Sequence, residues 1–184
     1  MTNRNVSNTC FSGKPSFDPK IYIACLASYN EGRLFGEWID ATLDPELIQK
    51  EIFNMLAKSP VANAEEFAIH AYEDFGSISL GEYESMSNVH EIAIFIQKHG
   101  ELGAELYAYT DNLEDSKYML ENNYHGEHDS ELDFAMQLFD DCYMHEVPKS
   151  IQYYIDYDAF RRDLFSSDYY SINVNGYTHV FSHH

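Results

Sequence analysis

The chain has 184 residues, of which 45% are hydrophobic, enough to build a buried core in one large domain or in two or three small ones. Acidic residues outnumber basic ones by 31 to 11, and this excess excludes direct binding to a nucleic-acid backbone, which needs cationic side chains. No apolar run approaches the length of about 18 residues that a membrane span requires, and the N-terminal stretch lacks the apolar centre of a secretory signal, so we expect a soluble intracellular protein without membrane partners.

The acidic excess is confined to the middle of the chain. Residues 59–148 hold 20 acids and only two bases, whereas residues 1–58 and 149–184 each have a net charge of −1. Two carboxylates about 7 Å apart in water repel each other by roughly 0.6 kcal/mol before salt screening. A surface of this kind costs stability unless its charge serves a function.

The first predicted domain is a small α+β unit over residues 21–76, which follows a polar, flexible extension over residues 1–20. The apolar run at 21–30 has β-branched and aromatic members and predicts a buried strand. Residues 37–43 predict a second strand, and the alternation at 65–75 predicts a third. Three strands and one helix therefore make up this unit.

The helix is predicted between the second and third strands. Asp44 followed by Pro45 is typical of a helix start, with the Asp44 side chain as the cap and proline in the first turn. Apolar residues recur at helical spacing from Leu47 to Leu56, and Pro60 follows. The pattern predicts a helix that ends before Pro60.

The second predicted domain, residues 77–122, is helical and acidic. Asn88, with Glu91 three residues later, has the pattern of a capping box and begins one helix, which Gly100 ends. Two short helices are predicted next, the second of them begun by Asp111.

The third predicted domain, residues 123–184, is again α+β. It starts with a loop at residues 123–130, and Ser130 then begins a helix. A short helix at 157–165 follows, and Asn175-Gly176 between two alternating runs is a strong signal of a β-hairpin with a type I′ turn. The fold class predicted for the chain is thus α+β, with three small domains in an elongated row.

The helix that Ser130 begins places carboxylates on its outer face. The apolar residues predicted to face inward are Leu132, Ala135, Met136 and Phe139. The carboxylates left for solvent are Glu131, Asp133, Asp140 and Asp141. The last two lie near the helix C-terminus, where each opposes the helix dipole at a cost of some tenths of a kcal/mol. A sequence selected for stability alone would have lysine at these positions.

Histidines and a cysteine between residues 125 and 145 are candidate metal ligands. They are His125, His128, Cys142 and His145. Zinc motifs on a helix place two ligands four residues apart. Calcium-binding loops alternate acidic positions in a DxDxDG pattern. This segment of the sequence contains neither motif. We therefore expect no metal and no cofactor. A metal-dependent hydrolase that uses the His/Asp cluster at 125–145 stays open as an alternative.

No recognisable catalytic motif supports an enzyme. The sequence contains no GxSxG, no P-loop and no GxGxxG. Glu73 and Asp74 are a candidate acid/base pair, but the solvated end of a strand also accounts for them. His70 lies in an alternating strand, as structural histidines do. We therefore expect a protein without catalytic activity.

Aromatic residues are abundant, with 15 tyrosines and 12 phenylalanines. Such rings stack on bases in single-strand binders, but that mode also needs a cationic groove. Tyrosines among carboxylates are instead suited to a protein interface. Tyr22, Tyr107 and Tyr154 are exceptions that we predict in the core.

The hypothesis that remains is that carboxylates substitute for phosphates. Duplex DNA carries one charge per about 1.7 Å of axis, so the net charge of −18 in residues 59–148 corresponds to roughly 30 Å of duplex. This length suits a DNA-binding groove, and the inhibition would be competitive and sensitive to salt. An acidic adaptor for another basic DNA-binding protein is a second alternative.

Five stretches of the sequence resemble the ArdA antirestriction proteins. They are "IYIACLASYNEGRLFGEWIDA", "SPVANAEEFAIHAYEDFG", "NYHGEHDSELDFAMQLFDD", "YYIDYDAFRRDL" and the closing "HVF". The resemblance covers about residues 21–181 in the expected order, so it is more specific than charge alone. Phe67 and Ala71 depart from the family pattern, where we expect tryptophan and an acid, and the first 20 residues are an extra extension.

The resemblance implies an inhibitor in the cytoplasm of a bacterial host, encoded by a conjugative plasmid or transposon. Such a protein mimics bent B-DNA and occupies the DNA-binding site of a type I restriction-modification enzyme, which is formed by a methyltransferase core with its specificity subunit. The resemblance also implies an elongated, curved homodimer with three small α+β domains in each chain. It implies no cofactor, no catalysis and no bound nucleic acid.

The carboxylates predicted to bind the enzyme are those of the acidic middle region, and their role would be collective. They are Glu65, Glu66, Glu73, Asp74, Glu82, Glu84, Glu101, Glu105, Asp111, Glu114, Asp115, Glu121, Glu127, Asp129, Glu131, Asp133, Asp140 and Asp141.

Overall fold

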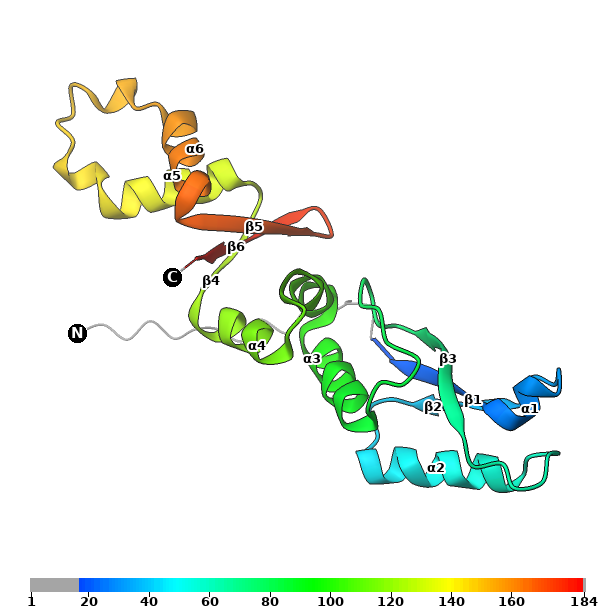
Figure 1. The fold of residues 1–184 in the computed structure, drawn as a ribbon. Coiled ribbons are helices and arrows are strands. Elements are labelled where there is room, and N and C mark those ends of the chain that lie inside the picture. Colours follow the sequence, from blue (N-terminus) through cyan, green and yellow to red (C-terminus); the bar gives the residue numbers. More distant parts are fainter. Residues whose placement is uncertain (1–16, 184) are drawn as a thin grey trace. The chain divides into compact units, whose positions relative to one another are not determined.

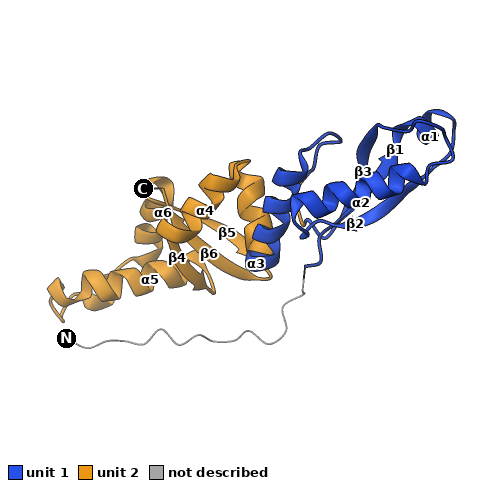
Figure 2. Cartoon of the chain, turned by 90° about the horizontal axis from the view of Figure 1, so that it is seen from below, with its two compact units in different colours: residues 1–75, 79–100 blue, residues 76–78, 101–184 orange. Residues whose placement is uncertain are grey.

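The computed structural model describes residues 17–183, which form a mixed α+β fold (Figure 1). The described residues contain six α-helices, two short 3₁₀ helices and two three-stranded antiparallel sheets. They divide into two compact units (Figure 2). The first runs to Phe75 and resumes at Ser79–Gly100, and the second consists of Gly76–Ile78 and the residues from Glu101 onward. The α+β class is confirmed, whereas the division into three domains stays a prediction.

The sheet of the first unit has the strand order β2-β1-β3. β1 is Lys20–Cys25, β2 is Gly36–Asp40 and β3 is Phe67–Glu73. β1 is central, and Ile21 and Ile23 are fully buried on it. The three strands predicted for this part of the chain are present with shorter bounds.

The strand predicted over residues 21–30 is wrong beyond Cys25. After this residue the chain leaves the sheet and forms the short helix α1, Leu26–Asn30. Ser28 is buried there, and its Oγ lies 3.0 Å from the Oγ of Ser59. This hydrogen bond fixes the chain in a turn, so the apolar run cannot continue along the sheet.

Helix α2, Pro45–Ala57, turns one face toward the core of the first unit. Ile48 and Ile52 are fully buried on this face, as the helical spacing of the sequence predicts. Pro45 occupies the first turn, but the Asp44 side chain makes no capping hydrogen bond, so that part of the prediction is wrong. The backbone oxygen of Asp44 instead accepts from the N–H groups at the start of the helix.

Helix α3, Met86–Thr110, is broken at Gly100, where φ is 64° and ψ is −147°. Glycine adopts this conformation freely and residues with a Cβ adopt it only under strain. The predicted end of a helix at Gly100 is therefore confirmed. The predicted capping box is wrong, because the Oγ of Ser85 accepts from the Asn88 N–H at 3.2 Å and the helix starts at Met86.

Helix α4, Leu113–Asn122, has Asn112 as its cap rather than the predicted Asp111. The Asn112 Oδ1 accepts from the N–H groups of Glu114 and Asp115 at 2.9 and 3.1 Å. Asp111 has a φ of 51°, and its N–H donates to the carbonyl of Tyr107 at 2.7 Å. Asp111 thus ends α3 and does not begin α4.

The sheet of the second unit has the strand order β4-β6-β5. β4 is Tyr124–His128, β5 is Tyr169–Val174 and β6 is Tyr177–Ser182. The predicted hairpin is confirmed, since Asn175 and Gly176 both have positive φ, as a type I′ turn requires. The loop predicted over residues 123–130 is wrong because β4 pairs with β6.

Helices α5, Glu131–Cys142, and α6, Tyr157–Ser167, accompany this sheet. The Ser130 Oγ caps α5 as predicted, accepting from the N–H of Asp133 at 3.0 Å. Phe134 is the buried aromatic residue of α5, whereas Met136 is exposed, contrary to the prediction. Met136 therefore lies about half a turn away from the face of α5 that is buried, which contains Phe134.

Tyr154 is also misplaced by the sequence, since it is 84% exposed instead of lying in the core. No helix among residues 17–183 is both long and apolar enough to cross a membrane.

Candidate functional site

Most of the carboxylates singled out in the sequence have exposed side chains. Only Glu84, Glu101, Glu105 and Glu131 of that set are partly covered, and none is buried. Most members of the set lie at the ends of strands, in loops and in the first and last turns of helices, whereas Glu105 lies within α3 and Glu127 within β4. The structure thus leaves a high density of negative charge open to a partner in each compact unit.

In the first unit, carboxylates flank both ends of β3. Glu65 and Glu66 precede the strand, Glu73 ends it and Asp74 follows with a φ of 59°. Aspartate adopts this left-handed conformation more easily than most residues. The backbone N–H of Asp18 donates to Asp74 at 3.4 Å, so Asp74 keeps an oxygen for another partner.

In the second unit, carboxylates occupy the first turns of two helices. Glu114 and Asp115 follow the Asn112 cap of α4, and Asp133 lies in the first turn of α5. Carboxylates at these positions interact favourably with the helix dipole. Asp140 and Asp141 lie at the opposite end of α5, where the dipole disfavours them.

Glu131 differs from the other carboxylates because the fold already uses both of its oxygens. Its Oε2 accepts from Arg161 Nη1 at 3.0 Å, and its Oε1 accepts from the Ser171 Oγ at 2.9 Å. The Glu131 and Arg161 side chains are 32% and 29% exposed. The prediction that Glu131 is left for solvent is therefore wrong, because this residue joins α5 to α6 and β5.

Asp140 is also engaged, although it stays exposed. Its Oδ1 accepts from the Tyr157 hydroxyl at 2.7 Å, which raises the pKa of Tyr157. The hydrogen bond links the last turn of α5 to the first turn of α6. The Tyr157 hydroxyl carries no positive charge, so this contact does not pair Asp140 with a cation.

Lysine and arginine neutralise few of these carboxylates. Within residues 17–183, lysine and arginine form ion pairs with two members of the set, Lys117 with Glu114 at 2.8 Å and Arg161 with Glu131 at 3.0 Å, and His179 Nε2 lies 3.7 Å from Glu127. An exposed ion pair such as the first contributes little to stability. Few of these negative charges are therefore neutralised by a lysine or arginine among residues 17–183.

The candidate metal ligands do not converge. His125 and His128 lie on β4, whereas Cys142 and His145 come after ten or more residues of α5, a helix of about 18 Å at 1.5 Å per residue. Burial among the rings of Phe134 and Tyr169, and then the proximity of His128, lowers the pKa of His125. In the described part of the chain, no three His, Cys, Asp or Glu residues are grouped so that they could hold a metal ion. The hydrolase alternative finds no support in this geometry.

The sequence is matched by the family model described as antirestriction protein (ArdA), and the match covers residues 21–179. The chain belongs to the ArdA family. No curated protein matches it. ArdA membership implies an antirestriction function and an interaction with restriction enzymes, and it describes an inhibitor rather than an enzyme. The resemblance stated from the five stretches of sequence is thereby confirmed.

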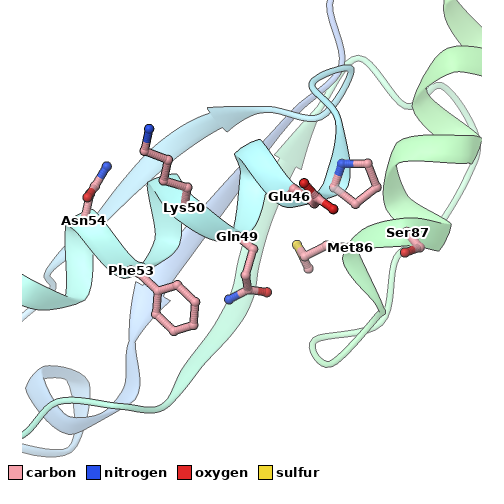
Figure 3. A pocket seen from close by; sticks show the side chains of 8 residues that line it. Glu46, Gln49, Lys50, Phe53, Asn54, Met86 and Ser87 are labelled. Carbon is pink, nitrogen blue, oxygen red and sulfur yellow. The ribbon is translucent and has the colours of Figure 1, made fainter.

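A pocket in the first unit of this ArdA protein was not expected from the sequence. It has a volume of about 550 Å³, and Gln49 and Phe53 project into this region from one side of α2 while Met86 extends toward them from the start of α3 (Figure 3). Glu46 and Lys50 are the charged residues of its lining. The lining contains no histidine or cysteine.

Sequence reasoning also missed a polar chain that joins β4 to β6 in the ArdA fold. The Tyr124 hydroxyl lies 2.7 Å from His179 Nδ1, and His179 Nε2 lies 3.7 Å from Glu127. Burial raises the pKa of Tyr124 to about 12. The register of the two strands brings Glu127 opposite His179, 52 positions later in the chain, so no local pattern reports this contact.

Proposed function

We propose that this ArdA protein is a DNA mimic that competitively occupies the DNA-binding site of a type I restriction-modification enzyme. The observation that carries the proposal is the exposed set of carboxylates, few of which pair with a lysine or arginine among residues 17–183. A site built for duplex DNA presents lysine and arginine side chains to phosphates. Carboxylates offer the same acceptor chemistry to these side chains.

The magnitude of the charge agrees with this proposal. Residues 59–148 carry a net charge of −18, equivalent to about 30 Å of duplex at one charge per 1.7 Å. Charges of this sign also steer the inhibitor toward a cationic groove and raise its association rate. A protein without catalysis can therefore block the enzyme by mass action alone.

The partner in this proposal is the methyltransferase core with its specificity subunit, because this part of the enzyme holds the target duplex. The inhibitor acts as a homodimer in the cytoplasm of a bacterial host, and it binds neither nucleic acid nor a membrane. Its chain would be organised as the three small domains predicted from the sequence, residues 21–76, 77–122 and 123–184.

An electrophoretic competition assay tests the proposal. Purified type I methyltransferase core is bound to a labelled target duplex at low salt, and the full chain is added in increasing amounts. We expect release of the DNA at stoichiometric or slightly higher concentrations of the chain. DNA that stays bound under a large excess of the chain would exclude this mechanism.

A variant with His125, His128 and His145 replaced by glutamine serves as a control. These side chains are not part of the carboxylate set, so the variant should still displace DNA. Loss of inhibition in the triple variant, with the fold intact by circular dichroism, would instead point to chemistry at the histidines.

A further inference from the structure

The pocket between α2 and the start of α3, here named the α2–α3 pocket, leaves a large apolar side chain open to solvent. Phe53 lines the pocket and is 61% exposed. Met86 extends toward it from the start of α3, and Pro45 adds a third apolar surface (Figure 3). An apolar concavity of this kind on a strongly charged protein marks a binding site.

Polar groups surround these apolar side chains. The amides of Gln49 and Asn54 and the hydroxyl of Ser87 offer hydrogen-bond donors and acceptors to a peptide backbone. Glu46 and Lys50 carry opposite charges, so the lining is neutral as a whole. An apolar centre with a neutral polar rim suits a short peptide that inserts one large apolar side chain.

Residues 1–16, which lie outside the described part of the chain, supply such a peptide. They hold two of the 11 basic residues, Arg4 and Lys14, and none of the 31 acidic ones. A positively charged segment is attracted to the rest of a chain whose net charge is −20. Phe11 is the aromatic residue of the segment. The family match begins at residue 21, so membership in the ArdA family assigns no role to these residues.

The length of the segment matches the distance to the α2–α3 pocket. The ring of Phe17, the first described residue, lies 3.9 Å from the position that a Cβ would take on Gly100. From Gly100 back to Met86, the first part of α3 rises about 21 Å at 1.5 Å per residue. Six residues of extended chain, from Phe17 back to Phe11, span about 20 Å. Phe11 is thus the residue that an extended segment brings to the pocket.

The surface of α3 between these two points offers the segment an apolar contact. Ile94 is 40% exposed on the first part of this helix. It lies seven residues after Ser87 of the pocket lining, a spacing that places both residues on the same side of the helix. A segment that runs along α3 to the pocket therefore covers Ile94 on its way.

We propose that residues 1–16 bind along the first part of α3 and place the Phe11 ring in the α2–α3 pocket between Phe53 and Met86. The Phe11 and Phe53 rings then form an aromatic pair, and the Met86 sulfur contacts a ring. The pocket is in this way occupied by a segment of the same chain. Binding needs no restriction enzyme, so it is tested on the chain alone and stands or falls separately from the proposed function.

The covalent connection lets a weak contact suffice. A short linker gives a tethered segment an effective concentration in the millimolar range. A contact with an intrinsic dissociation constant of about 1 mM, which one buried aromatic ring can supply, is then formed about half of the time or more. A free peptide of the same sequence would need a millimolar concentration to compete.

Disulfide trapping tests the position of the segment. Cys10 is adjacent to Phe11, and a disulfide forms only where two Cα atoms approach within about 7 Å. Gln49→Cys places a thiol in the pocket lining, and Cys142→Ser removes an exposed thiol from the background, while Cys25 is buried. Under mild oxidation we expect a disulfide between positions 10 and 49 within one chain, identified by peptide mass spectrometry.

The matched control is Glu51→Cys in the same Cys142→Ser background. Glu51 is exposed on the same helix but is not part of the pocket lining. The cysteine at position 49 should react with Cys10 at least fivefold faster than the cysteine at position 51. Adding Phe11→Ser to the Gln49→Cys variant should remove most of this difference, because the segment loses the side chain that anchors it.

Hydrogen exchange of chains without engineered cysteines provides a second measurement. The first N–H groups of a helix have no acceptor within the helix, so those at the start of α3 exchange readily unless something covers them. Exchange at residues 86–88 should be severalfold faster in Phe11→Ser than in the wild type. Strand β6 of the second unit should exchange equally in both, and circular dichroism checks the fold of each variant.

Three results would overturn the inference. They are equal rates of disulfide formation at positions 49 and 51, a Phe11→Ser variant that forms the disulfide as fast as its parent, and a disulfide that joins two chains instead of closing within one. The last result, seen as a band of twice 21.3 kDa on a non-reducing gel, would assign the pocket to a second copy. Hydrogen exchange at residues 86–88 that is the same with and without Phe11 would likewise contradict the binding of the segment.

Discussion

At the scale of single residues, Glu131 and Glu65 illustrate two uses of a carboxylate in the same chain. Glu131 is bound by Arg161 and by the Ser171 hydroxyl, whereas Glu65 is exposed ahead of β3. A side chain that is already held by the fold cannot reorient toward a partner without breaking these bonds. Glu131 therefore contributes to stability, and Glu65 is available for recognition.

Replacement of Glu131 by alanine should lower the free energy of unfolding by about 1–2 kcal/mol, because Arg161 and Ser171 lose their acceptor in a partly covered site. Urea denaturation followed by circular dichroism measures the change. The matched Glu65→Ala variant should stay within about 0.5 kcal/mol of the wild type. Equal losses in the two variants would contradict the structural role of Glu131.

At the scale of elements, the two ends of α5 place the same kind of side chain in opposite fields. Asp133 lies in the first turn, where the helix dipole favours it, and Asp141 lies in the last turn, where the dipole disfavours it. In the proposed function the cost at Asp141 is tolerated because its charge is presented to the enzyme.

The same charge change at the two ends should thus have opposite effects on stability. Asp141→Lys should raise the free energy of unfolding by about 0.3–1 kcal/mol at low salt, and Asp133→Lys should lower it by a similar amount or more. Thermal unfolding at low and high ionic strength measures both. Both variants should inhibit the enzyme less well than the wild type. A gain of stability for Asp133→Lys would show that the helix dipole does not cause the stability differences.

The stacked rings of Tyr170, Tyr109 and Phe181 in the second unit predict that the protein loses stability at alkaline pH. Burial raises the pKa of Tyr170 to about 12, and the ring stacks on Tyr109 and Phe181 at centroid distances of 5.0 and 5.3 Å. In the unfolded chain a tyrosine ionises near its usual pKa of about 10, so ionisation then favours the unfolded state. Stability from Tyr170 is complete below pH 10 and is lost as the pH rises toward 12.

Urea denaturation between pH 9 and about 12 tests this dependence, and Tyr170→Phe is the control. The variant keeps the stacked ring but has no ionisable hydroxyl, so its loss of stability over this range should be smaller than that of the wild type. It also loses the hydrogen bond to the Met119 sulfur at 3.2 Å, so its stability near neutral pH should be slightly lower. Identical slopes for both proteins would contradict the assignment.

Elements specified by short-range chemistry were predictable, and elements specified by distant partners were not. The Asn175-Gly176 turn and the Ser130 cap each depend on residues within a few positions, and both predictions are confirmed. β4 is polar and contains Gly126, so the sequence pattern resembles a loop, and its pairing with β6 comes from a strand about 50 positions away. In the same way, the amino-acid composition was enough to locate the acidic region. The contact between Arg161 and Glu131 could not be predicted, because the two residues are 30 positions apart and meet only in the fold.

At the scale of the whole molecule, the net charge of −20 makes ionic strength the main control on any interaction with a cationic partner. The logarithm of the binding constant falls linearly with the logarithm of the salt concentration, and the slope reports the number of charge contacts. Removal of one contacting charge lowers the steepness by about one. The slope of this salt plot thus distinguishes two kinds of carboxylate. Replacing one that contacts the enzyme lowers the steepness, and replacing one that only stabilises the fold does not.

The variant with Glu65, Glu66 and Glu73 all replaced by glutamine should bind the methyltransferase core more weakly at low salt and with a slope shallower by up to about three. These residues are exposed at the two ends of β3, and glutamine keeps their shape while removing their charge. Competition titrations at four or more salt concentrations measure the slopes, and the curves of variant and wild type should converge at high salt. Glu131→Gln should leave the slope unchanged, because Arg161 already neutralises that carboxylate. Parallel salt plots for the wild type and the triple variant would mean that the three carboxylates act without their charge, and mimicry of phosphates could not then explain the inhibition.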